Sequence, residues 1–168
     1  MKPVELDAVD IRILCALQAH GQLSKSKLAD MVGLSETPCW ARRARLTKAG
    51  LIAGYHADIA LSRIVALTKV VVTVSLKSHH KSDFVQFEKY ILNCHEVTDC
   101  VSTGGGMDYV MTVVTTCLPA FQTLMEGMLD AELGIDRYMT YIATRQIKSV
   151  RPELARLVAV RGPEVETG

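Results

Sequence analysis

The chain has 168 residues, 49% of them hydrophobic and 22% charged, with a formal net charge of +1. These values are typical of a soluble globular protein of one large or two small domains, and they exclude a polybasic tail. The uncharged stretches are too short and too polar for a membrane span, and the first residues lack the apolar run of a signal peptide. We therefore expect a cytoplasmic protein with no membrane partner.

The first third of the chain has the apolar spacing of helices. In "LDAVDIRILCALQAHG" apolar residues recur every three or four positions, and Gly21 ends the pattern. Ser24 is placed to cap a second helix that Gly33 ends, and Ser35 to cap a third that runs to Lys48 and stops at Gly50. Three helices of this length, joined through "VGLS", predict a helix-turn-helix over residues 1–54.

The third predicted helix concentrates positive charge. It carries four basic residues and only one acidic residue. Such side chains neutralise DNA phosphates, and residues near the start of a recognition helix contact base edges. A solvated basic face on a helical bundle is the alternative interpretation. The predicted DNA-binding residues are Ser35, Glu36, Thr37, Arg42, Arg43, Arg45 and Lys48.

After a linker strand expected over residues 55–65, the pattern changes. Short β-branched runs alternate with amphipathic stretches in the order strand, helix, strand, strand, helix, strand over residues 66–150. This order predicts a split βαβ domain, in which an antiparallel sheet carries both helices on one face. Because the other face needs cover, we expect self-association. Residues 151–168 form a C-terminal segment of undetermined state, frayed from Gly162 onward.

The turn "STGGGMDY" joins two of these strands. Glycine amides are unobstructed donors for a carboxylate, and Asp108 or nearby carbonyls can accept from an ammonium group. A plain hairpin, with Asp108 locking the turn through backbone contacts, is the alternative.

Catalytic and metal sites are not indicated. The five cysteines include no CxxC pair, and the sequence contains no paired carboxylates, nucleophile–base motif or phosphate loop. We expect no cofactor, no metal and no enzymatic activity.

The chain resembles the Lrp/AsnC family of transcriptional regulators over about residues 5–150. The resemblance rests on "LDAVDIRIL", "GLSETPC", "GLI", the "GYHA" wing, "GGMDYVMTV" and "GIDRYMTYIATRQIK". It implies an α+β chain, with a winged helix-turn-helix followed by a ferredoxin-like βαββαβ domain, often called RAM. It also implies binding to double-stranded DNA, dimers that assemble into octamers, and an amino acid or related effector bound where the glycine loop meets a neighbouring subunit.

From this resemblance we expect an effector site with six residues: Gly104, Gly105, Met107, Asp108, Tyr109 and Thr140. Three positions depart from the family pattern. Arg43 stands where a small apolar residue is usual, Ala44 where a basic one is usual, and Gly104 where a polar one is common. An architectural DNA-binding protein without a small-molecule signal is the alternative function.

Overall fold

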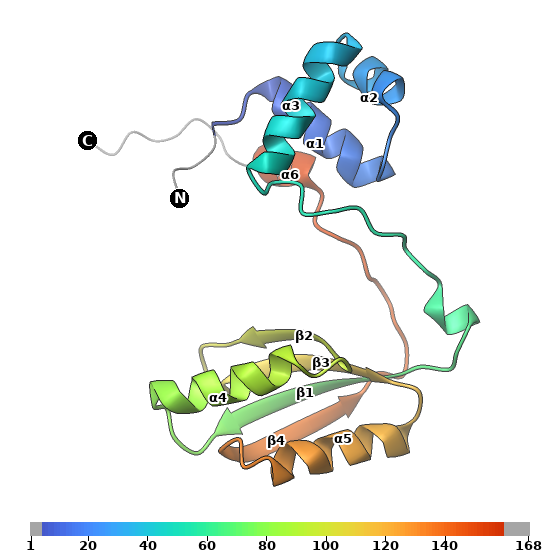
Figure 1. The fold of residues 1–168 in the computed structure, drawn as a ribbon. Coiled ribbons are helices and arrows are strands. Elements are labelled where there is room, and N and C mark those ends of the chain that lie inside the picture. The colour runs from blue at the N-terminus through green and yellow to red at the C-terminus, as the bar shows by residue number, and fades with distance from the viewer. Residues whose placement is uncertain (1–4, 160–168) are drawn as a thin grey trace. The chain divides into compact units, whose positions relative to one another are not determined.

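The computed structural model describes residues 5–159, which fall into two compact units (Figure 1). Unit 1 comprises the chain up to Asp58 together with the segment from Ser149 onward, and unit 2 runs from Ile59 to Lys148. The expected fraying from Gly162 lies outside the described residues. No helix within the described range is both long and apolar enough to cross a membrane.

Unit 1 is a bundle of short helices. They are α1 (Ala8–His20), α2 (Lys25–Val32), α3 (Glu36–Lys48) and α6 (Leu154–Ala159). The apolar faces of α1, α2 and α3 meet in one core, formed by Ile13, Leu17, Leu28, Ala29, Val32, Cys39 and Leu46. The helix-turn-helix expected from the sequence is confirmed.

Local caps explain where these helices begin and end. The Ser24 side chain accepts a hydrogen bond from the Lys27 amide, and Gly33 adopts a left-handed conformation with φ of 70°. Ser35 precedes α3 as expected, but its side chain makes no capping bond. The acceptor at this position normally receives the amide of the third helical residue, which here is Pro38 and has no N–H.

The C-terminal segment folds back onto unit 1, which the sequence did not predict. Gln18 on α1 donates from Nε2 to the carbonyl of Pro152 and accepts from the Leu154 amide, both at 2.9 Å. These bonds anchor the start of α6 against α1, so residues 151–159 belong to unit 1.

The strand expected over residues 55–65 is absent. The chain is extended through the "GYHA" segment and then forms a short 3-10 helix, Leu61–Arg63. A strand requires a hydrogen-bonded neighbour, and the structure places none beside this segment in the sheet order.

Unit 2 has the predicted split βαβ arrangement. Its elements are β1 (Thr68–Leu76), α4 (Lys81–Leu92), β2 (Val97–Ser102), β3 (Tyr109–Thr115), α5 (Leu118–Asp130) and β4 (Ile135–Ile142). The strands are antiparallel in the order β2-β3-β1-β4. The last strand ends at Ile142.

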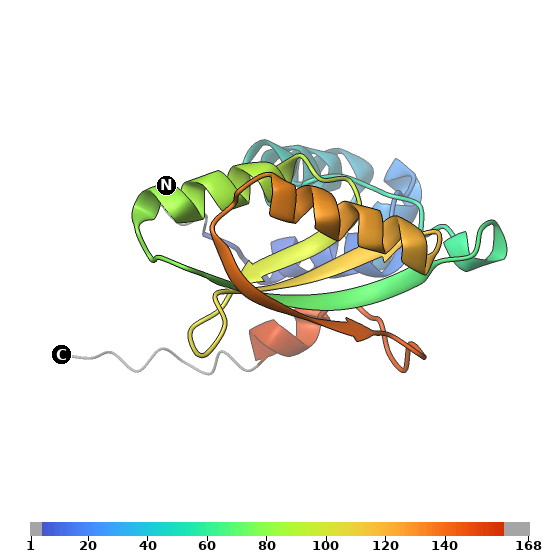
Figure 2. The same ribbon diagram turned by 90° about the horizontal axis from the view of Figure 1, so that it is seen from below.

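The two faces of this sheet differ. Val70, Val72 and Val74 on β1 are fully buried beneath α4 and α5, which Figure 2 shows on one side of the sheet. The alternate residues Val71 and Thr73 point to the other face and are only partly buried. Within unit 2 this second face has no covering helix.

Candidate DNA-binding surface and effector loop

Helix α3 has an inward and an outward side. Cys39 and Leu46 are buried in the core of unit 1. The opposite side carries an exposed row with helical spacing, made of Thr37, Ala41, Ala44 and Lys48. The predicted residues Ser35 and Glu36 are also exposed, at the start of the helix. The outward row and the first turn of α3 are therefore exposed on the side away from the core of unit 1.

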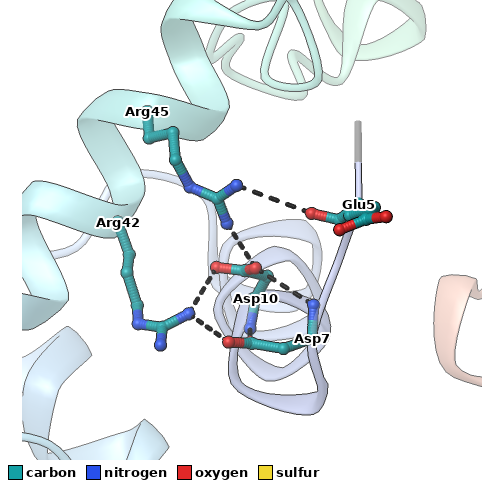
Figure 3. Close-up of polar contacts among 5 residues, drawn as sticks. All are labelled: Glu5, Asp7, Asp10, Arg42 and Arg45. Atoms are coloured by element: carbon teal, nitrogen blue, oxygen red, sulfur yellow. Dashed lines mark hydrogen bonds and ion pairs between the residues drawn. The ribbon is translucent and has the colours of Figure 1, made fainter. Parts of the chain in front are cut away.

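Arg42 and Arg45 point instead toward the start of α1 (Figure 3). Arg42 Nη1 lies 2.5 Å from Asp7 Oδ2 and 3.0 Å from Asp10 Oδ1. Arg45 pairs through Nη2 with the other oxygen of Asp10, and its Nη1 donates to the carbonyl of Glu5 at 3.5 Å. Both arginines thus have carboxylate partners within the domain.

The same two aspartates cap α1. Asp7 Oδ1 accepts the Asp10 amide at 2.8 Å, and Asp10 Oδ2 accepts the Asp7 amide at 3.1 Å. This reciprocal arrangement is a capping box. Asp10 is 1% exposed. Its carboxylate therefore joins the start of α1 to α3.

The charges of the network favour ionised aspartates. Burial raises the pKa of Asp10, but hydrogen bonds from Arg45, the Asp7 amide and Arg42 outweigh burial and leave that pKa below its ordinary value. The Asp10 amide and then Arg42 lower the pKa of Asp7, and the two aspartates raise the pKa of Arg42. The network is therefore fully charged at neutral pH.

Arg43 lies on the other flank of α3. Its guanidinium is 4.4 Å from the centre of the Trp40 ring and 5.7 Å from that of Tyr55, and Nε donates to the Tyr55 hydroxyl at 3.4 Å. Lys25 Nζ lies 4.9 Å from the same Trp40 ring. Arg43 therefore connects α3 to the extended segment that follows it, and Trp40 is a packing platform for two cations.

The roles of Asp7 and Asp10 were not predicted from the sequence. Both are acidic residues suited to a first helical turn, but their pairing with α3 was not foreseen. A signal was present, since Asp7 and Asp10 are spaced by three, as are Arg42 and Arg45. That spacing places each pair on one helix face, so the two faces can form matched ion pairs when the helices pack.

In unit 2, Asp108 anchors the glycine loop. Its Oδ2 accepts the Leu76 amide at 2.8 Å, and its Oδ1 lies 3.0 Å from His79 Nε2. Its backbone amide donates to the carbonyl of Val74, and its carbonyl accepts the Thr103 amide. The turn-locking role of Asp108 is therefore present in the structure.

The tip of the loop is open. Gly104, Gly105 and Gly106 are exposed, and a Cβ added at any of them would meet no atom within 4 Å. Gly105 has φ of 148°, which side-chain-bearing residues rarely adopt. Met107 is partly buried, and Arg137 donates to the carbonyl of Gly106 at 3.2 Å. Backbone groups of the tip are thus accessible to a ligand.

Two of the predicted effector residues lie away from this tip. Tyr109 is 2% exposed in the core, and its hydroxyl donates to Glu88 Oε1 at 2.9 Å. Burial and that carboxylate raise the pKa of Tyr109. Thr140 is exposed on β4, opposite Val72 of β1. The structure does not bring these two side chains together with the glycines within one chain.

Unit 2 also has a groove of about 530 Å³ that the sequence did not indicate. The residues lining it are Gln86, Lys89, Tyr90, Asn93, Cys94, Glu96, Leu124, Ala131 and Leu133. None of the predicted effector residues is among them. Within residues 5–159, no three side chains of metal-binding type gather at one point.

Comparison with known proteins identifies both halves of the chain. Residues 6–53 match a winged helix-turn-helix DNA-binding family, and residues 69–153 match the Lrp/AsnC ligand binding domain. Transcriptional regulatory protein DoeX of Halomonas elongata is 41% identical over 145 residues, which are 86% of this chain and 92% of that protein.

Solved structures agree with this assignment. An AsnC family transcriptional regulator from Agrobacterium tumefaciens is 28% identical with a TM-score of 0.81, covering 88% of this chain and 95% of that one. A transcriptional regulator from Neisseria meningitidis, in complex with L-Met, is 27% identical with a TM-score of 0.79, covering 86% and 94%. With its DNA-binding and ligand-binding domains in this order, the chain belongs to the Lrp/AsnC family of transcriptional regulators, which are not enzymes.

Proposed function

We propose that this regulator self-associates through the uncovered face of its sheet and binds specific operators. We further propose that an amino acid or a related small molecule, bound at the glycine loop, changes its DNA occupancy. Dimers place two recognition helices on one face of the DNA, and octamers are the expected higher assembly. Because its partner is DNA, we place it in the cytoplasm, associated with the nucleoid.

The open glycine loop is the observation that carries the sensing part. Its exposed backbone amides suit a carboxylate, and the bonds of Asp108 hold the loop in one conformation. The methionine complex of the Neisseria meningitidis relative supports an amino acid as the ligand class. Since Tyr109 and Thr140 do not join the glycines within one chain, a neighbouring subunit is the expected source of further contacts.

Assembly is supported by apolar residues on the uncovered face. Cross-strand pairs point to the same side of a sheet, so Val71 of β1 shares this face with Val101, Met139 and Tyr141 of the other strands. The last three side chains are 47–52% exposed. Thr73, also on this face, has a buried hydroxyl without a hydrogen-bond partner among the described residues. A second copy of the sheet would remove this apolar area from water.

An effector can act only through differential affinity. If it binds two assemblies equally well, DNA occupancy does not change, however tightly it binds. A coupling of 1–3 kcal/mol, typical of such systems, would alter DNA affinity roughly 5–150-fold. The strength of the proposed switch therefore depends on contacts formed between subunits.

The test is a DNA-binding titration at fixed salt concentration. It compares the fragment upstream of the protein's own gene with random DNA, in the absence and presence of each of the twenty amino acids. We expect preference for the upstream fragment and a shift with at least one amino acid. Preference that no amino acid alters would contradict an amino acid as the effector and would leave another small molecule, or no effector. Equal affinity for both DNAs would favour an architectural protein, because cationic contacts alone bind any sequence.

A further inference from the structure

Half of the positive charge on the recognition helix is neutralised inside the domain. Helix α3 carries four basic residues and one acidic residue, a net charge of +3, and the two aspartates of the α1 capping box reduce it to +1. Figure 3 shows both guanidinium groups directed at these carboxylates. The arginine side chains remain 34% and 47% exposed, on the flank of α3 beside its outward row.

We propose that Asp7 and Asp10 are positioning residues for DNA binding, which hold Arg42 and Arg45 against α1 and withhold them from DNA phosphates. This inference rests on the proposed function, because it assumes that α3 is the helix that meets DNA. It assigns the sequence-independent attraction to other cations, among them Lys48 on the outward row.

The burial of Asp10 explains why Arg42 and Arg45 remain paired with it when DNA binds. If both turned to phosphates, the Asp10 carboxylate, 1% exposed, would remain charged without its two ionic partners. An uncompensated buried charge costs several kcal/mol, and this cost opposes the transfer of both arginines to phosphates. The internal pairs therefore persist when DNA binds.

Withholding these cations favours specificity. Each phosphate neutralised by a lysine or arginine strengthens binding to every DNA sequence equally. Keeping Arg42 and Arg45 away from phosphates lowers the affinity for random DNA. The choice of DNA sequence then depends on base contacts from the first turn and the outward row of α3. Specificity is the ratio of the two affinities, so it increases.

The experiment measures the slope of log affinity against log salt concentration, on the upstream fragment and on random DNA. Full-length protein is compared with Arg42→Gln, Asp10→Asn and Asp7→Ser. Lys48→Ala is the control for a cation expected to face phosphate. Serine at position 7 retains a capping oxygen, and the Asp7 side chain is 51% exposed, so we expect Asp7→Ser to fold. It replaces Asp10→Asn in the test where Asp10→Asn unfolds.

We expect Arg42→Gln to leave the slope unchanged and Lys48→Ala to reduce it by about 0.9 for each phosphate that the lysine neutralises. Asp10→Asn removes the carboxylate partner of Arg45, while Arg42 keeps Asp7. Its slope on random DNA therefore steepens by about 0.9, or about eightfold in affinity per tenfold change in salt. Asp7→Ser steepens the slope by a smaller amount, and both variants lower the ratio of upstream to random affinity.

Two results would overturn the inference. One is a slope that falls by about 0.9 in Arg42→Gln, because Arg42 would then bind a phosphate. The other is an unchanged slope in a folded Asp10→Asn or, where that variant unfolds, in Asp7→Ser. Loss of wild-type preference for the upstream fragment is a different outcome, which contradicts the specific operator but leaves the slopes interpretable.

Discussion

Replacing Asp10 with alanine should destabilise unit 1 by about 2–3 kcal/mol. Removing one partner of a buried ion pair costs roughly 3–5 kcal/mol. Here Arg42 and Arg45 are 34% and 47% exposed, and after the change they keep Asp7 and the Glu5 carbonyl as partners, so water and these groups recover part of the loss. The capping bond to the Asp7 amide is removed as well.

The assay is urea unfolding followed by tryptophan fluorescence. Trp40 is the only tryptophan in the chain and lies in α3, so its signal reports unit 1 separately from unit 2. Asp30→Ala, which removes an exposed aspartate on α2, is the matched control and should change stability by less than about 0.5 kcal/mol. A loss for Asp10→Ala as small as that of the control would refute the reasoning.

The same network predicts a dependence on pH. Folding lowers the pKa of Asp7 and Asp10, so their stabilisation is complete above the unfolded value of about 4 and is lost as the pH falls through the folded values. The difference in stability between wild type and Asp10→Ala should therefore be constant near neutrality and shrink below about pH 4. A difference that stays constant down to pH 2 would contradict an ionic origin.

Three further changes test other contacts. Arg43→Met removes the guanidinium stacked on Trp40, so we expect the stability of unit 1 to fall by about 0.5–1 kcal/mol and the emission maximum of Trp40 to change. An unchanged spectrum and an unchanged stability would show that the stack does not persist in solution. Asp108→Ala leaves the Leu76 amide without its acceptor and should lower the stability of unit 2 by about 1–3 kcal/mol. Asp108→Asn keeps an acceptor and is the control. Equal thermal unfolding of the two variants would exclude the anchoring role. Tyr141→Asp places a charge on the uncovered sheet face and should yield a smaller species in sedimentation velocity, and unchanged sedimentation would exclude that face as the interface.

Local sequence determined the elements of this protein. The cap at Ser24, glycines at helix ends and the spacing of apolar residues predicted three helices and then the split βαβ order, because these signals act within a few residues of one another. The same order predicted a sheet with one covered and one open face, and β1 alternates between buried and partly buried residues accordingly. The strand expected over residues 55–65 does not form in the described chain, because no strand of the sheet lies beside this segment there.

Only the tertiary structure decided what the charged residues do. The spacing of Arg42 and Arg45 shows that they share a helix face, but the same spacing fits an exposed DNA-binding face and an internal ion pair equally well. Their partners lie 32–35 residues earlier in the chain and become neighbours only when α1 packs against α3. A charged side chain pairs with the opposite charge that the fold places nearest to it at a site with little solvent exposure. No local sequence pattern specifies that partner.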